Sequence, residues 1–130
     1  MLAGADAVVL CTPHTAETEN LIGAEEIAAF KPGMVLVNIA RGLVIDEEAM
    51  IDALRDGRIA FAALDVFRTE PLPKDSPLWD LSNVLINPHS ASTAPSENGK
   101  ITDIFIRNLR HYLDGRYEEM SPVLDKRRLY

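Results

Sequence analysis

Four ionisable side chains stand at or just beyond the ends of apolar runs that are typical of buried strands. Arg41 ends one such run, Asp65 and Glu70 follow the next, and His89 follows the last. The carboxyl ends of parallel strands meet at one edge of a sheet, where ligands of open α/β proteins bind, so we expect one shared crevice. An arginine fork can hold a carboxylate, and a histidine beside a glutamate can pass a proton to or from a neighbouring oxygen.

Each of these side chains also has an ordinary structural explanation. Arg41 can be a surface arginine that closes a strand, and His89 a strand-end histidine with satisfied hydrogen bonds. Glu70 can be a solvated loop carboxylate, and Asp65 a residue that favours a turn. Taken singly, these readings are at least as good as the functional ones. Their occurrence together at one predicted sheet edge is what favours a site.

Strands and helices alternate along the segment that must position these residues. Apolar runs at residues 6–12, 34–39, 59–66 and 84–86 predict strands, and residues 24–30 predict a short helix. Asp46 predicts the N-cap of a second helix that ends before Gly57, and residues 95–114 predict the longest helix. The proline-rich residues 67–82 exclude a regular helix, and residues 116–130 are expected to lie extended. This order predicts an α/β fold with a parallel sheet.

Composition narrows the class of protein. The chain has 130 residues, of which 47% are hydrophobic, and its formal net charge is −7, which disfavours a nucleic-acid or anionic-membrane partner. A single cysteine, Cys11, excludes an internal disulfide and fits a reducing compartment. The start lacks a signal-peptide pattern and no run is long enough to span a membrane. We therefore expect a cytoplasmic protein, and we expect no metal site.

Three stretches resemble the D-isomer-specific 2-hydroxyacid dehydrogenases, in that family's order and spacing. A preceding loop, Thr12-Pro13 with residues 15–23, resembles the family as well, so the resemblance runs from about residue 5 to the end. The three stretches read Asn38-Ile-Ala-Arg41-Gly-Leu-Val-Ile-Asp46-Glu, Ala63-Leu-Asp65-Val-Phe-Arg-Thr-Glu70-Pro71-Leu-Pro and Pro88-His89.

The resemblance implies hydride transfer between a nicotinamide cofactor, NAD or NADP, and a small 2-keto or 2-hydroxy acid. Arg41 matches the arginine that holds the substrate carboxylate, His89 the proton donor and acceptor, and Glu70 the carboxylate that pairs with it. Developing charge on the substrate oxygen needs a proton and a nearby cation, which agrees with these roles. The implied cofactor-binding positions are Thr12, Pro13, Ile39, Ala40, Arg41, Asp65, His89 and Ser92, with Asp65 beside the nicotinamide end.

No Gly-x-Gly-x-x-Gly fingerprint occurs in the chain, although family members carry one upstream of the first strand seen here. The simplest account is the carboxyl-terminal part of such an enzyme, a Rossmann-type half-domain. Residues 1–93 are then the second half of the NAD(P)-binding domain, and residues 94–130 a helix and tail that return to the substrate domain. Leu78-Trp79 and the ending at residues 125–130 resemble the glyoxylate/hydroxypyruvate reductase branch.

Taken alone, the chain is expected to be inactive and to form a homodimer or higher oligomer through uncovered apolar faces. Two other readings stay open. The chain can be a non-catalytic α/β fragment that serves only as an assembly or binding module. It can also be another Rossmann enzyme that shares only the fold, in which case arginine, glutamate and histidine should not converge.

Overall fold

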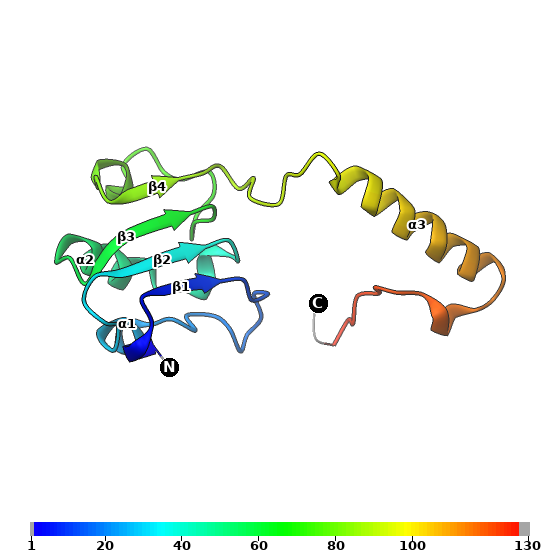
Figure 1. Cartoon of the computed structure of the whole chain (residues 1–130), viewed down its shortest axis with the longest axis horizontal. Coiled ribbons are helices and arrows are strands. Elements are labelled where there is room, and N and C mark those ends of the chain that lie inside the picture. Colours follow the sequence, from blue (N-terminus) through cyan, green and yellow to red (C-terminus); the bar gives the residue numbers. More distant parts are fainter. Residues whose placement is uncertain (1, 128–130) are drawn as a thin grey trace. The chain divides into compact units, whose positions relative to one another are not determined.

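The computed structural model of the chain describes residues 2–127 and divides at residue 91 into two units, each of which is described by itself. The first unit contains a four-stranded sheet, and the second a long helix (Figure 1). The expected assignment of residues 1–93 and 94–130 to parts of two domains stays a prediction.

All four strands of the first unit are parallel and lie in the order β1-β2-β3-β4. They comprise β1 (Ala7–Leu10), β2 (Met34–Asn38), β3 (Ile59–Leu64) and β4 (Val84–Ile86). The predicted α/β class with a parallel sheet is therefore confirmed. β3 ends two residues before the end of the expected strand, 59–66. The apolar run predicted burial correctly, since Val66 is only 2% exposed, but burial continues past the last paired residue.

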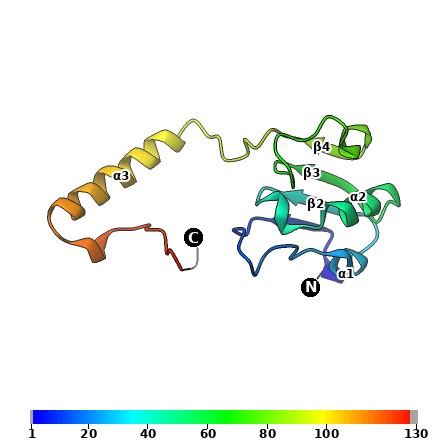
Figure 2. The ribbon, with the colours of Figure 1, turned by 180° about the vertical axis from the view of Figure 1, so that it is seen from behind.

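Two helices, α1 (Ala24–Ala28) and α2 (Glu47–Arg55), belong to the same unit. Seen from behind, α2 crosses in front of the strands (Figure 2). The predicted N-cap is confirmed, since the Asp46 carboxylate accepts a hydrogen bond from the Ala49 N–H at 3.2 Å. Met50, Leu54 and their neighbours bury the inner face of α2 with the sheet residues Leu36 and Ile59, and this layer supports the strand ends. Short 3₁₀ helices occur at Leu2–Gly4, Gly42–Val44 and Pro77–Asp80.

One face of the sheet carries exposed apolar side chains. Val9, Phe61 and Leu85 are 55%, 39% and 57% exposed. The strand register places Val9 beside Val37 and Phe61 beside Val35, so these side chains share the face opposite the core residue Leu36. An exposed apolar sheet face of this kind is typical of a surface that contacts another segment or another chain.

The second unit consists of α3 (Glu97–Leu113) and a 3₁₀ helix at Tyr117–Glu119. The predicted long helix is confirmed, although α3 begins and ends slightly inside the expected 95–114. The expected extended tail is wrong at its start, because Arg116 pairs with Asp114 at 2.8 Å and Glu119 at 2.7 Å and folds the chain into a turn.

The apolar face of α3 is one of the faces expected to be uncovered in this chain, and its residues Ile101 and Phe105 are 56% and 63% exposed. Within residues 2–127, no helix is long and apolar enough to cross a membrane. Residues 128–130, part of the ending that resembles one reductase branch, lie outside the described residues.

Candidate active site

A buried asparagine shapes the turn that carries Arg41. Asn38, the last residue of β2, is 1% exposed, and its Oδ1 accepts a hydrogen bond from the Ala40 N–H at 3.0 Å. Its Nδ2 donates to the Arg41 carbonyl at 3.3 Å, so one side chain satisfies two backbone groups of the turn. The Arg41 guanidinium is exposed and donates to the Ala40 carbonyl at 2.6 Å. Among residues 2–127, no carboxylate forms an ion pair with Arg41, so its charge is open to an anionic ligand.

The carboxylate of Asp65, directly after β3, organises the segment after β4. Asp65 is 6% exposed, and its oxygens accept the backbone N–H groups of Ser90, at 2.7 Å, and Ala91, at 3.1 Å, and a further hydrogen bond from Asn87 Nδ2. Burial by itself raises the pKa of this carboxyl, but these hydrogen bonds and the nearby His89 hold the pKa below its ordinary value. Asp65 is therefore held as a carboxylate that anchors residues 87–91.

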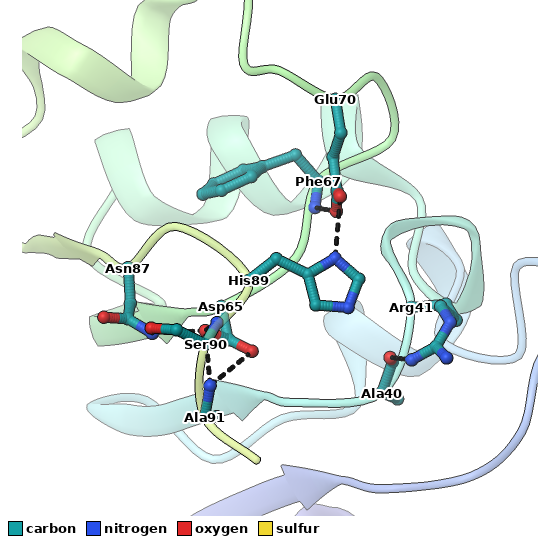
Figure 3. A network of polar contacts seen from close by, with 9 residues as sticks. All are labelled: Ala40, Arg41, Asp65, Phe67, Glu70, Asn87, His89, Ser90 and Ala91. Carbon is teal, nitrogen blue, oxygen red and sulfur yellow. Dashed lines mark hydrogen bonds and ion pairs between the residues drawn. The ribbon is translucent and has the colours of Figure 1, made fainter. Parts of the chain in front are cut away.

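This anchoring fixes the unusual backbone of His89. His89 has φ +50°, a left-handed conformation that costs a non-glycine residue of order 1 kcal/mol and needs support from its surroundings. Its N–H is shared between the carbonyls of Asp65, at 2.9 Å, and Asn87, at 3.0 Å. The turn projects the imidazole toward the loop that carries Glu70 (Figure 3).

The imidazole of His89 meets the carboxylate of Glu70. His89 Nδ1 lies 2.7 Å from Glu70 Oε2, while Glu70 Oε1 accepts the Phe67 N–H at 3.0 Å (Figure 3). The hydrogen bond to His89 holds the pKa of Glu70 below its ordinary value, against the effect of burial and with help from the Phe67 N–H and the charge of Arg41. An ionised Glu70 can only accept, so Nδ1 carries the ring proton of the pair, and Nε2 is left to exchange a proton with a ligand.

The structure brings Arg41 into the same region as this pair. Figure 3 shows the ring edge away from Glu70 turned toward the turn of Ala40 and Arg41. A cavity of about 520 Å³ adjoins Glu70 and His89 on the side walled by Phe67 and Trp79, and Arg41 does not line it. The positive charge of Arg41 can hold an anion on this side of the ring, and Nε2 of His89 can exchange one proton with that anion.

The other predicted site residues differ in their exposure and in their hydrogen bonds. The Thr12 hydroxyl is buried and has no hydrogen-bond partner within residues 2–127, and the Ile39 side chain is 45% exposed, so both fit contact with a bound group. Pro13 is exposed and follows β1, whereas the Ala40 side chain is buried. Ser92 begins the second unit, and its assignment stays a prediction. Residues 2–127 contain no cluster of three potential metal-binding side chains.

Sequence reasoning missed the residues that act through backbone contacts. Asn38 belongs to one of the stretches that resemble the family, but no function was predicted for it. No function was predicted for Asn87 or Gly42 either. Asn38 carried one usable signal, because it shares the core-facing side of β2 with Leu36 and a polar residue there needs a specific partner.

Comparison with known proteins identifies the fold's relatives. Residues 1–91 match the family model for D-isomer specific 2-hydroxyacid dehydrogenase, NAD binding domain. The chain belongs to this family. The resemblance seen in the sequence is thus confirmed, and with it the Rossmann-type class of the sheet.

Named relatives are longer than this chain. It is 44% identical, over 119 residues, to glyoxylate/hydroxypyruvate reductase B of Pectobacterium atrosepticum, covering 92% of this chain and 37% of that protein. It is 42% identical, over 139 residues, to D-3-phosphoglycerate dehydrogenase of Mycobacterium leprae, covering 96% of this chain and 26% of that protein. The chain thus spans well under half the length of these relatives.

Among solved structures, a D-isomer specific 2-hydroxyacid dehydrogenase from Xanthobacter autotrophicus Py2, in complex with NADPH and MES, is similar with a TM-score of 0.87. It is 45% identical, and the match covers 99% of this chain and 52% of that one. The likeness extends over both units of this chain.

Proposed function

We propose that this chain carries the acid-binding and proton-transfer part of an NAD(P)-dependent oxidoreductase for small 2-keto or 2-hydroxy acids. The observation that carries the proposal is the Nδ1–Oε2 hydrogen bond of 2.7 Å between His89 and Glu70, with the Arg41 charge acting on the same carboxylate. The names of its relatives support glyoxylate or hydroxypyruvate as the substrate class.

Each residue has a physical role in this proposal. Arg41 binds the substrate carboxylate by its planar fork and places a positive charge near the 2-oxygen. His89 gives a proton from Nε2 to that oxygen on reduction and takes it back on oxidation. Glu70 holds Nδ1–H, fixes the ring orientation and stabilises the imidazolium. The nicotinamide, when bound, supplies or accepts the hydride.

The residues that would hold the nicotinamide end are those after β1 and β2. Thr12, with its unpaired hydroxyl, and Pro13 follow β1, and Ile39 with Ala40 follows β2. Asp65 acts here as the anchor of the His89 turn, and Ser92 extends the same segment. These positions fit a planar, partly apolar group that needs a few hydrogen bonds.

A second candidate function is that of a non-catalytic assembly module. The exposed sheet face with Val9, Phe61 and Leu85 favours it, because such a face needs a partner. Self-association is part of both candidates, and a cytoplasmic setting is supported by the single free cysteine, Cys11.

The proposed function is tested in a chimaera in which residues 1–130 replace the matching part of the Xanthobacter relative. The chimaera is expected to oxidise NADPH with glyoxylate or hydroxypyruvate. Arg41→Ala is expected to raise KM and lower kcat, with a loss in kcat/KM of about tenfold to a hundredfold, because the lost hydrogen bonds are charged on both sides.

Arg55→Ala is the matched control, since Arg55 lies on the exposed side of α2 and, within residues 2–127, forms an ion pair only with Asp52, at 3.2 Å. Steady-state kinetics should show this control unchanged. A folded chimaera without activity toward either acid, or equal kinetics for the two arginine variants, would contradict the proposed roles.

For the 130-residue chain itself, we predict weak NADH binding and self-association. Pyrophosphate is held by a glycine turn at a helix N-terminus, and these residues contain no such fingerprint. Leu85→Glu, which charges the exposed sheet face, should reduce the size of the assemblies. Calorimetric titration with NADH and light scattering measure both properties, and micromolar NADH binding by a monomer would refute the prediction.

A further inference from the structure

Gly42 lies where the turn after β2 crosses the loop that follows β3. A Cβ atom built on Gly42 would stand 1.9 Å from the Phe67 carbonyl carbon, 2.0 Å from its oxygen and 2.3 Å from the Arg68 nitrogen. All three are backbone atoms, so no side-chain rotation can relieve the clash. Any side chain at this position must therefore move the loop, the turn or both.

The peptide group between Phe67 and Arg68 is also held from a second side. Glu47, the first residue of α2, accepts the Arg68 N–H on its Oε2 at 2.9 Å. The neighbouring Phe67 N–H donates to Glu70 Oε1 at 3.0 Å. One short stretch of backbone thus contacts the Arg41 turn through Gly42, contacts α2 through Glu47, and holds the carboxylate that meets His89.

We propose that Gly42 and Glu47 are positioning residues that fix the Phe67–Arg68 peptide and, through it, the Glu70 carboxylate against His89. Neither touches the reacting atoms. Gly42 sets how closely the loop approaches the Arg41 turn, and Glu47 prevents the loop from rotating about that contact. The arginine turn and the glutamate loop then behave as one body, which keeps the acid-binding charge and the proton-transfer pair in a fixed relation. The catalytic meaning of this coupling rests on the proposed function, but the geometry does not.

A purely structural role makes a different prediction. If Gly42 only allows close packing, its replacement lowers the stability of the chain and leaves the ionisation of Glu70 unchanged. If it positions Glu70, its replacement weakens the hydrogen bonds from His89 and the Phe67 N–H, and the pKa of Glu70 rises toward its ordinary value. The ionisation of one carboxylate therefore separates the two roles.

The experiment is a titration of the Glu70 side-chain carboxyl by carbon-detected NMR in the 130-residue chain. Gly42→Ala is expected to raise the pKa of Glu70. The matched control is Gly4→Ala, because a Cβ at Gly4 meets nothing within 4 Å and its φ is not left-handed, and it should leave the titration unchanged.

Two substitutions of Glu47 keep the proposal testable if Gly42→Ala fails to fold. Glu47→Ala removes the acceptor for the Arg68 N–H and is expected to raise the pKa of Glu70. Loss of the Glu47 charge alone would lower that pKa by relieving repulsion, so a rise reports lost geometry. Glu47→Gln loses the same charge but keeps an acceptor oxygen, and it should leave the pKa of Glu70 at or below the wild-type value.

Equal Glu70 titrations in Glu47→Ala and Glu47→Gln, or an unmoved titration in a folded Gly42→Ala, overturn the proposal. The titration needs neither substrate nor cofactor. An inactive chimaera would therefore contradict the proposed function but not this positioning role. An active chimaera, together with an unchanged pKa of Glu70 in the variants, would contradict the positioning role but not the proposed function.

Discussion

His89→Gln is expected to lower the turnover number of the chimaera by about 10²–10⁴-fold, the usual contribution of a general acid–base group. Glutamine can still accept and donate hydrogen bonds, but it cannot carry a proton between the substrate oxygen and solvent. The dissociation constant of NADPH should change far less, because in the proposed function His89 exchanges a proton with the substrate and most of the cofactor is held by other residues. Single-turnover kinetics and fluorescence titration of NADPH measure the two effects separately.

His111→Gln is the control for this substitution. His111 lies on α3, and its Nδ1 stands 3.4 Å from Glu119 Oε2, so this contact lies within the second unit. Turnover in this variant should stay near that of the parent chimaera. If His89→Gln retained parental turnover, or weakened NADPH binding as much as turnover, the proton-transfer role would be wrong.

The apolar runs in the sequence were enough to predict where Arg41, Asp65 and His89 lie relative to the sheet. Buried parallel strands are continuous apolar runs, and the residue that follows each run stands at the carboxyl edge regardless of loop detail. The contact between Glu70 and His89 could not be derived in this way. It depends on a loop that folds back after Phe67, whose N–H binds the Glu70 carboxylate, whereas the strand-end positions predicted only that Glu70 and His89 share one edge of the sheet.

Residues that act by backbone contact left little trace in the sequence. Gly42 was needed for the close approach of two loops that are distant along the chain, and no local pattern reveals such a crossing. The resemblance placed Asp65 beside the cofactor, while the structure shows its carboxylate engaged with Asn87, Ser90 and Ala91. The exposed faces of β1 and α3 were predicted as apolar, but what covers them is a property of other segments or chains.

Asp65→Asn is expected to lower the free energy of unfolding by about 3 kcal/mol, the scale of one or two charge-assisted hydrogen bonds lost in a buried site. The one oxygen that an amide keeps can still accept from Ser90 and Ala91, but it carries no negative charge, and the NH2 group then replaces Oδ2, the second acceptor of the Ala91 N–H. The strained φ of His89 adds to the effect, because these hydrogen bonds hold the turn in place. Urea denaturation near neutral pH measures the change.

The control is Asp52→Asn, at an exposed ion pair with Arg55, which should change the free energy of unfolding by less than about 0.5 kcal/mol.

The effect of Asp65→Asn should itself depend on pH. The pKa of Asp65 is lower in the folded chain than its ordinary value, so folding favours the carboxylate, and the stabilisation is complete above the pKa of the unfolded state. It is lost as the pH falls through the lowered pKa of the folded state, because the native carboxyl then takes up a proton as well. The difference in unfolding free energy between the wild-type chain and the variant is therefore expected to shrink as the solution is acidified. A difference that stayed constant from neutral to strongly acidic pH would show that Asp65 supports the His89 turn by packing, and that its charge has no part in holding it.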